Sequence, residues 1–180
     1  MIHRDSNSTA APVKRRVAAT VGVAAASLAA VVLPAGTSNA QPTVCTAEML
    51  NVTTVERPSD SPSQSHLDIV LTNTSAEACG VQGFPGVDLV GPDDPTFGPT
   101  YSLPRQDAGF APVMVEPGSA VASTLTYLPG GPDDWVPDTV VVIPPDTTTP
   151  MDAPWPEGVS VQRQDGATHP GTYISPLKPA

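Results

Sequence analysis

The sequence predicts an all-β fold, a two-sheet antiparallel sandwich of about seven to eight short strands. The chain of 180 residues contains 23 Pro and 14 Gly, and proline removes an amide donor and clashes with the preceding helical turn. After residue 40, no window of a dozen residues combines helical periodicity with freedom from proline, so any helix there should be a single turn. Residues 66–73 alternate instead between apolar and polar side chains, as in a half-buried strand.

The strands are expected where short apolar or β-branched runs lie between Pro, Gly and Ser. The first run, residues 51–56, is rich in Val and Thr, and a Ser/Pro-rich loop follows it at residues 58–65. The alternating run 66–73 is the clearest strand of the chain. Further strands are expected at residues 86–90, 112–115, 120–128, 139–143 and 159–162, with a weaker one at 172–175. Residues 144–180 are Pro-rich, and we expect them to be partly irregular.

The first forty residues have the order of a secretory signal peptide. A Lys-Arg-Arg cluster precedes an uncharged Ala/Val-rich run at residues 17–33, and small residues follow as far as Ala40. We expect cleavage between Ala40 and Gln41, which leaves one domain of residues 41–180, secreted or held in the cell envelope. The alternative is a retained membrane anchor, because the apolar run approaches the lower length limit for a span. The residues leave the choice between general secretory and twin-arginine export open.

Removal of the signal peptide makes the chain more acidic. Residues 41–180 keep four of the eight Lys and Arg and 17 of the 18 Asp and Glu, a net charge of −13. Such a charge repels nucleic acid and anionic lipid headgroups, so we expect a protein or envelope component as the partner. The four remaining cations are Arg57, Arg105, Arg163 and Lys178.

Cys45 and Cys79 are the only cysteines, and an even number in an exported chain indicates a disulfide. On the chain-entropy estimate this bridge stabilises the fold by about 3–4 kcal/mol. A catalytic thiol would need a neighbouring histidine and an unpaired cysteine. The cysteines are therefore interpreted as structural.

The tetrapeptide Gly-Pro-Asp-Asp occurs twice, at residues 91–94 and 131–134. Pro and Asp favour β-turns, so both copies are expected to be turns between strands. A calcium loop is the less favoured alternative, because it needs several oxygen ligands at alternating positions. Loops at the ends of a rigid sandwich commonly carry recognition. The candidate recognition residues are Asp93, Asp94, Asp133, Asp134 and Trp135.

The sequence has no Gly-x-Ser-x-Gly elbow and no glycine-rich phosphate loop. We therefore expect no catalytic residue, no cofactor and no metal. The function favoured is a non-catalytic binding module. The alternatives are a secreted protease inhibitor that presents residues 59–65, a hydrolase-associated protein or, less favoured, a calcium or copper binder. A copper site would draw on His66, His169, Met114 and Met151.

Five short motifs follow one another between residues 45 and 145. They are Cys45, Leu-Thr-Asn-Thr-Ser and Cys at 71–79, Gly-Phe-Pro-Gly at 83–86, Glu-Pro-Gly-Ser-Ala at 116–120, and Pro-Pro at 144–145. In this order the chain resembles the exported actinobacterial family catalogued as domain of unknown function 4232. The resemblance implies an immunoglobulin-like β-sandwich, secretion or a lipoprotein anchor, and no established activity.

Two departures from the family pattern bear on the cysteines and on the Gly-Phe-Pro-Gly turn. Many relatives carry a second cysteine pair, one member of which would fall near residues 135–138, where this chain has none. The absence of that pair supports Cys45 and Cys79 as partners. Phe84 stands where the family usually has Tyr, which favours a packing role at this position.

Overall fold

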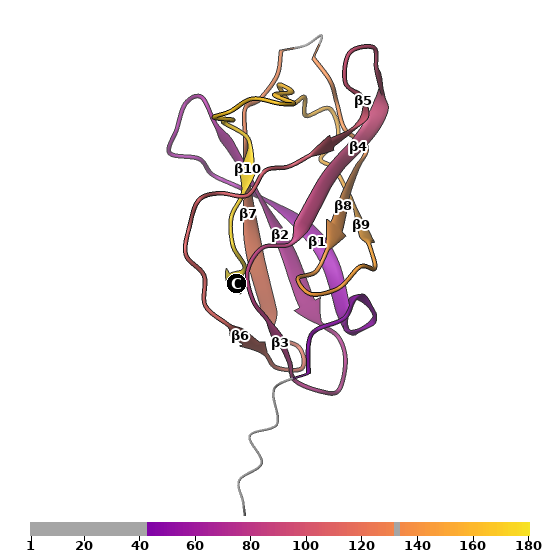
Figure 1. Cartoon of the computed structure of the whole chain (residues 1–180), viewed down its shortest axis with the longest axis vertical. Coiled ribbons are helices and arrows are strands. Elements are labelled where there is room, and N and C mark those ends of the chain that lie inside the picture. Colours follow the sequence, from indigo (N-terminus) through magenta and orange to yellow (C-terminus); the bar gives the residue numbers. More distant parts are fainter. Residues whose placement is uncertain (1–42, 132–133) are drawn as a thin grey trace, which may run out of the picture. The chain divides into compact units, whose positions relative to one another are not determined.

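The computed structural model describes residues 43–131 and 134–180, which form a sandwich of short strands (Figure 1). The prediction of an all-β, immunoglobulin-like sandwich is confirmed, and the described part of the chain holds eleven strands, more than expected. Its single helix is the 3-10 turn η1 (Ala47–Met49). No helix within the described ranges has the length and hydropathy of a membrane span. The predicted signal peptide, its cleavage site at Ala40 and Gln41, and Asp133 lie outside the described residues.

The first sheet has the strand order β1-β2-β7-β10, and β11 pairs with the same side of β7 further along. All its pairs are antiparallel. Its strands are β1 (Leu50–Arg57), β2 (Ser65–Asn73), β7 (Ala120–Tyr127), β10 (Tyr173–Ile174) and β11 (Lys178–Pro179).

The second sheet has the order β5-β4-β8-β9, and a separate two-stranded sheet pairs β3 with β6. These pairs are antiparallel as well. The strands are β3 (Cys79–Val81), β4 (Gly86–Asp94), β5 (Gly98–Ser102), β6 (Val113–Val115), β8 (Thr139–Ile143) and β9 (Met151–Pro154).

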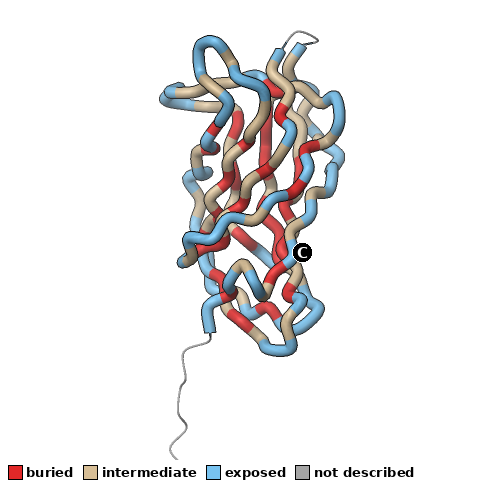
Figure 2. Tube along the Cα trace, turned by 90° about the vertical axis from the view of Figure 1, so that its right-hand side faces the viewer, coloured by how far each residue is buried: buried red, intermediate tan, exposed pale blue. Residues whose placement is uncertain are grey.

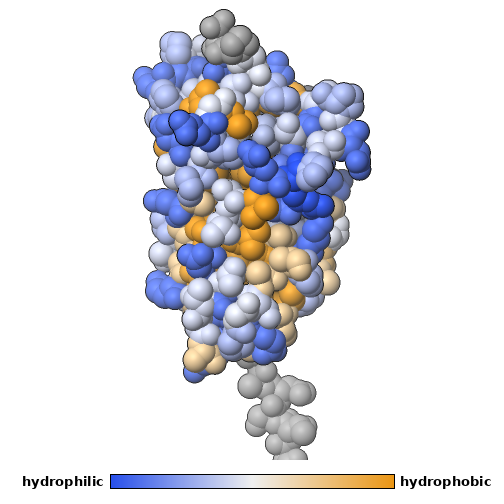
Figure 3. All heavy atoms as spheres, turned by 180° about the vertical axis from the view of Figure 1, so that it is seen from behind, coloured by the Kyte–Doolittle hydropathy of each residue, from blue (hydrophilic) through white to orange (hydrophobic). Residues whose placement is uncertain are grey.

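The core lies between the two larger sheets. In β2 the predicted alternation is observed: Leu67, Ile69 and Leu71 are at most 1% exposed, while the residues between them are half-buried. Val140 and Val142 of β8 are fully buried in the same cluster. Figure 2 shows the buried residues along the inward sides of the strands, and on the face opposite to Figure 1 apolar residues form a stripe flanked by polar ones (Figure 3).

The prediction of a strand at residues 159–162 is wrong. Only Val161 forms an isolated bridge, to Pro129. Its amide donates to Trp135 O, whereas the Gln162 amide donates to Leu128 O, so neighbouring amides bond to different segments and no ladder can extend. The prediction missed β3, β5, β9 and β11, which are two to five residues long and lack a periodic apolar pattern.

The end of the chain is built into the sandwich between β7 and the segment that joins β5 to β6, which we call the β5–β6 connector (residues 103–112). On one side the Ile174 amide donates to Pro104 O and the Gln106 amide donates to Ile174 O, both at 2.9 Å. On the other side the Ser175 amide donates to Thr124 O of β7. The Pro-rich C-terminal segment is therefore part of the first sheet at these positions.

Candidate binding site

The first Gly-Pro-Asp-Asp copy is not a turn, because residues 91–94 are the end of β4 and the turn follows at 95–97. The Asp94 carboxylate accepts hydrogen bonds from the amides of Thr96 and Phe97 at 2.8 and 2.9 Å. These amides, with Phe97 contributing most, and the Arg163 guanidinium to a lesser extent lower the pKa of Asp94 below its ordinary value. Asp94 thus fixes the β4–β5 turn.

The structure brings the two predicted recognition loops together at one end of the sandwich. The Trp135 indole N–H donates to Pro92 O at 2.8 Å, and Asp134 accepts a hydrogen bond from the Gly131 amide at 2.6 Å. Gly91 is required for this contact, because a Cβ there would lie 2.9 Å from Pro137 Cα. The polar groups of these loops therefore largely hold the loops themselves, and a role in recognition stays a prediction.

Next to these loops Arg163 occupies a buried site that we call the Arg163 cage. Its side chain is 3% exposed, and its guanidinium carbon lies 4.7 to 5.5 Å from the centroids of three aromatic rings. The guanidinium forms a bidentate pair with Asp165 at 2.7 and 2.9 Å. It also donates to three backbone carbonyls, in β5 and in the turn before it. The Arg163 side chain therefore covers the outer edge of β5. The rings are those of Phe97, Tyr101 and Trp135, and the carbonyls are those of Phe97, Gly98 and Thr100.

Tyr101 forms one wall of the Arg163 cage and is 2% exposed. Burial is the main cause that raises the pKa of its hydroxyl above the ordinary value, so the hydroxyl is neutral at physiological pH. Within the described residues Tyr101 Oη has no hydrogen-bond partner at good geometry, although it lies near Thr172. Tyr101 therefore contributes its ring to the cage and no hydrogen bond.

The disulfide end of the sandwich is held by neutral groups. The predicted Cys45–Cys79 disulfide is confirmed, with a Cα–Cα distance of 4.9 Å and both residues fully buried. Nearby, Asn73 is fully buried, and its amide group donates to Glu77 O and Val115 O at 2.8 and 2.9 Å. Its side-chain oxygen accepts from the amide and hydroxyl of Ser75. Every polar group of the Asn73 side chain is therefore paired.

The histidines and methionines of the less favoured copper hypothesis lie on separate elements. His66 is in β2, opposite Thr126, and His169 is in the loop before β10, where its ring lies 3.2 Å from the Thr168 hydroxyl. Met114 is in β6 and Met151 in β9. In the part of the chain that the structure describes, no three His, Cys, Asp or Glu side chains gather in a metal-binding arrangement.

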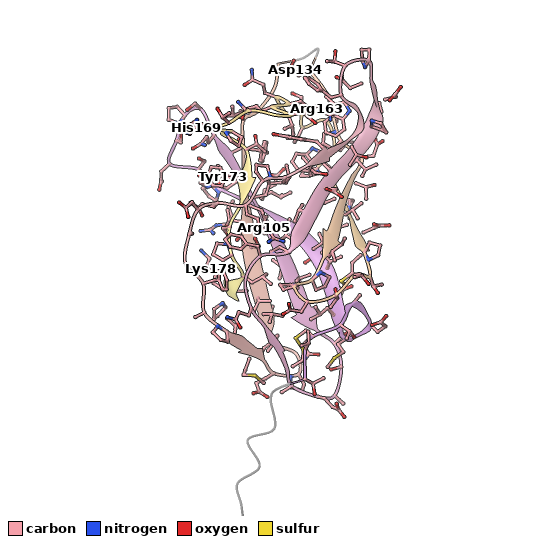
Figure 4. All side chains as sticks on the ribbon, in the orientation of Figure 1. Arg105, Asp134, Arg163, His169, Tyr173 and Lys178 are labelled. Carbon is pink, nitrogen blue, oxygen red and sulfur yellow. A yellow bond between two sulfur atoms is a disulfide. The ribbon has the colours of Figure 1, made fainter. Side chains whose placement is uncertain are left out.

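Hollows in the surface gather along the β5–β6 connector. A hollow of about 410 Å³ is lined by Arg105, Gln106, Asp107 and His169, among others, and we call it the polar hollow because most of its wall residues carry polar groups. Gln106 also lines an apolar hollow of about 400 Å³, whose walls include Phe110, Val113, Leu177 and Lys178. Two smaller hollows, of about 180 and 210 Å³, continue beyond Phe110 and Val113. We call this surface the connector face, and Figure 4 shows its labelled side chains (Arg105, His169, Tyr173 and Lys178).

The connector face carries Arg105 and Lys178, two of the four cations of residues 41–180. Arg57 pairs with Asp68 at 3.3 Å and Arg163 pairs with Asp165. Within residues 43–131 and 134–180, neither Arg105 nor Lys178 has a carboxylate within 4.0 Å.

Arg105 is held in place by aromatic packing. Its guanidinium carbon lies 5.9 Å from the centroid of the Phe84 ring. Phe84 in turn packs edge-on against Phe110, with the ring centroids 5.8 Å apart. This packing role is the one expected for Phe84.

Sequence reasoning proposed the acidic loops and missed the connector face. The available signal in the sequence was the small number of cations, because residues 41–180 contain only four Lys and Arg beside 17 Asp and Glu. Two of the four, Arg105 and Lys178, lie on this face. The sequence could not show which cations were already paired.

Comparison with known proteins relates the chain to a family and to no individual protein. Neither the curated proteins nor the solved structures include a significant match. A family described as Domain of unknown function (DUF4232) matches residues 45–173. The match includes the disulfide, Asn73, the Arg163 cage and the β5–β6 connector, but ends before Lys178. The chain belongs to the DUF4232 family.

Proposed function

We propose that this protein is an exported, non-catalytic binding module that contacts an envelope or secreted protein through the connector face. The observation that carries the proposal is the continuity of the polar and apolar hollows through Gln106, beside Arg105 and Lys178. Concave apolar surfaces with a few well-placed polar groups are the usual form of binding sites. Burial of both cysteines in a disulfide is compatible with export.

Exposed apolar side chains on the connector face support the same proposal. Phe110 is 52% exposed, although aromatic side chains of this size usually contribute to a core or an interface. Met114 and Val44, which line one of the smaller hollows, are 50% and 41% exposed. Their proximity along one series of hollows distinguishes them from single apolar residues scattered over a surface.

Site-specific photo-crosslinking in the producing cells tests this proposal. A photoreactive amino acid at position 110 of the full chain should give a discrete crosslinked product that contains a second protein. The same amino acid at position 55 is the matched control, because Val55 is 51% exposed but lies on β1, away from the hollows. No product at position 110, or the same product at both positions, would contradict the proposal.

A protease inhibitor is the second candidate, and the loop between β1 and β2 favours it. This loop extends outward from the sandwich (Figure 1, purple), and hydrogen bonds between Ser59 and Ser61 and between Ser61 and Ser63 shape it. A pre-shaped exposed loop can enter a protease cleft at low entropic cost. Inhibition of a secreted protease by the full chain, lost when Ser61 is changed to Gly, would support this role. Rapid cleavage of the loop without inhibition would exclude it.

A further inference from the structure

We infer that the connector face binds an extended peptide segment in which carboxylate side chains alternate with apolar ones. This inference rests on the proposed function and adds the chemistry of the partner. Three features lead to it: the series of hollows, the unused backbone groups of the connector, and two cations that form no ion pair with the described residues.

The hollows are suited to an extended chain. Three of them, of about 410, 400 and 210 Å³, follow one another along residues 105–114 and share Gln106 and Val113 as wall residues. The fourth, of about 180 Å³, lies beside these three and shares Arg105, Phe110 and Asp146 with them. Each measures about 180 to 410 Å³. An extended peptide advances about 3.3 Å per residue and points successive side chains to opposite sides, so its carboxylates can all face the hollows lined by Arg105 and Lys178 while its apolar side chains lie on the other side of the peptide.

The backbone of the connector can pair with such a peptide. The Gln106 amide is bonded to Ile174 O, but residues 107–112 form no backbone hydrogen bond with any described residue. No described side chain hydrogen-bonds to them either. In recognition by strand addition, main-chain hydrogen bonds supply affinity and side-chain pockets supply specificity. The connector offers both along the same segment.

Arg105 and Lys178 select for carboxylates. The Arg105 guanidinium forms part of the wall of the polar hollow and of the hollow of about 180 Å³. Its planar group of donors fits a carboxylate bidentately. Asp107 and Asp146 line the same two hollows and would repel a carboxylate placed beside them. A carboxylate of the peptide must therefore contact the Arg105 guanidinium directly or lie in the apolar hollow beside Lys178, whose described wall residues include no Asp or Glu.

The charge of the domain favours a peptide over an anionic lipid surface. A net charge of −13 over residues 41–180 repels a surface of anionic headgroups. A single carboxylate in contact with Arg105 is affected mainly by nearby charges, because salt screens interactions beyond about 8 Å at physiological ionic strength. A short acidic segment can therefore bind where an anionic membrane cannot.

Fluorescence anisotropy with labelled peptides tests the inference on the full chain. The probe is the blocked hexapeptide acetyl-Ala-Glu-Val-Glu-Val-Ala-amide, and its control has Gln in place of both Glu residues. The Glu peptide should bind more tightly than the Gln peptide, and Arg105→Gln should weaken its binding about tenfold, as expected when a charge-assisted hydrogen bond is lost. Lys178→Gln should weaken it less. Arg57→Gln is the matched control, since it removes the same charge from another exposed arginine.

Several outcomes would overturn the inference. Equal affinity for both peptides, equal weakening by Arg57→Gln and Arg105→Gln, or no saturable binding of the Glu peptide up to about 1 mM would each do so. Binding of phosphatidylglycerol vesicles that depends on Arg105, without binding of the Glu peptide, would assign the face to lipid instead. Circular dichroism of each variant shows whether it is folded.

The peptide assay and the photo-crosslinking experiment separate the two proposals. A product at position 110 without binding of the Glu peptide would leave the binding function intact and refute the peptide chemistry. Failure of both experiments would refute both proposals.

Discussion

The disulfide end and the Arg163 end of the sandwich both bury a polar side chain that bonds backbone carbonyls, but they do so by different chemistry. Asn73 is neutral, fully buried and close to a covalent link. Arg163 is charged, and aromatic rings and Asp165 hold it. A buried amide needs only hydrogen bonds, whereas a buried charge also needs a counter-ion to offset its desolvation.

The difference also appears in sequence distance. The side chain of Asn73 bonds Ser75 and Glu77 within four residues, and only Val115 is distant. Arg163 bonds carbonyls at positions 63 to 66 residues away, and only Asp165 is local. The disulfide end should therefore resist local perturbation, and the Arg163 end should depend on complete folding of the chain.

The largest expected effect is loss of the disulfide. Replacing both Cys45 and Cys79 by Ala should lower the free energy of unfolding by about 4 kcal/mol, because the bridge closes a loop with a sequence separation of 34 residues. Urea unfolding of the variant and of the parent measures this difference. A variant that retained the parental midpoint would show that the Asn73 hydrogen bonds alone hold this end.

Removing the guanidinium should have the next largest effect. Arg163→Met should cost about 3 kcal/mol, near the lower end of values for a broken buried pair, because the Asp165 side chain is 26% exposed. Arg163→Lys is the control, since it keeps the charge but cannot form the bidentate pair or bond three carbonyls. We expect the urea midpoint of Arg163→Lys to lie between those of the parent and of Arg163→Met. Equal midpoints for Met and Lys would show that geometry, and not charge, is what the cage requires.

Acid should affect the Arg163 end through Asp94. Because its pKa is lower in the folded protein, the carboxylate contributes stability above its ordinary pKa of about 4, and this contribution is lost as the pH falls through the lower folded pKa. Asp94→Asn keeps an oxygen for the Thr96 and Phe97 amides but should flatten the pH dependence of the urea midpoint below about pH 4. Asp93→Asn, at the neighbouring exposed carboxylate, should leave the slope unchanged. A parental slope in Asp94→Asn would disprove the role of its charge.

The smallest effect is expected at Tyr101. Tyr101→Phe removes a buried hydroxyl without a hydrogen-bond partner and keeps the ring beside Arg163. The free energy of unfolding should change by less than about 0.5 kcal/mol, or rise slightly. A loss of more than about 1 kcal/mol would show that the hydroxyl bonds Thr172 in solution.

The sequence predicted those parts of the structure whose signal is local. The alternation of Leu67, Ile69 and Leu71 identified β2 and its buried face, and the cysteine count in an exported chain identified the disulfide. The prediction of a strand at residues 159–162 was wrong because the amides of Val161 and Gln162 donate hydrogen bonds to two distant segments. Short strands such as β3 and β11 exist only because a partner strand is already in place.

The connector face could not be predicted because it forms only when three distant segments meet. Arg105 follows β5, Phe84 precedes β4, and Lys178 lies in β11. Nothing near Arg105 in the sequence indicates that its guanidinium lies over Phe84, whereas that of Arg163 is buried against Asp165. The signal in the sequence was the small number of cations, and it pointed to four residues without showing which of them form ion pairs.

The position of the C-terminal strands beside β7 has a consequence for how the protein is made. β7 pairs with β2 on one side, but its other side is completed only by β10 and β11. Pairing between strands so far apart in the sequence slows folding. A chain cut before Tyr173 would leave that edge of β7 without β10 and β11, and an exposed edge of this kind can pair with other chains.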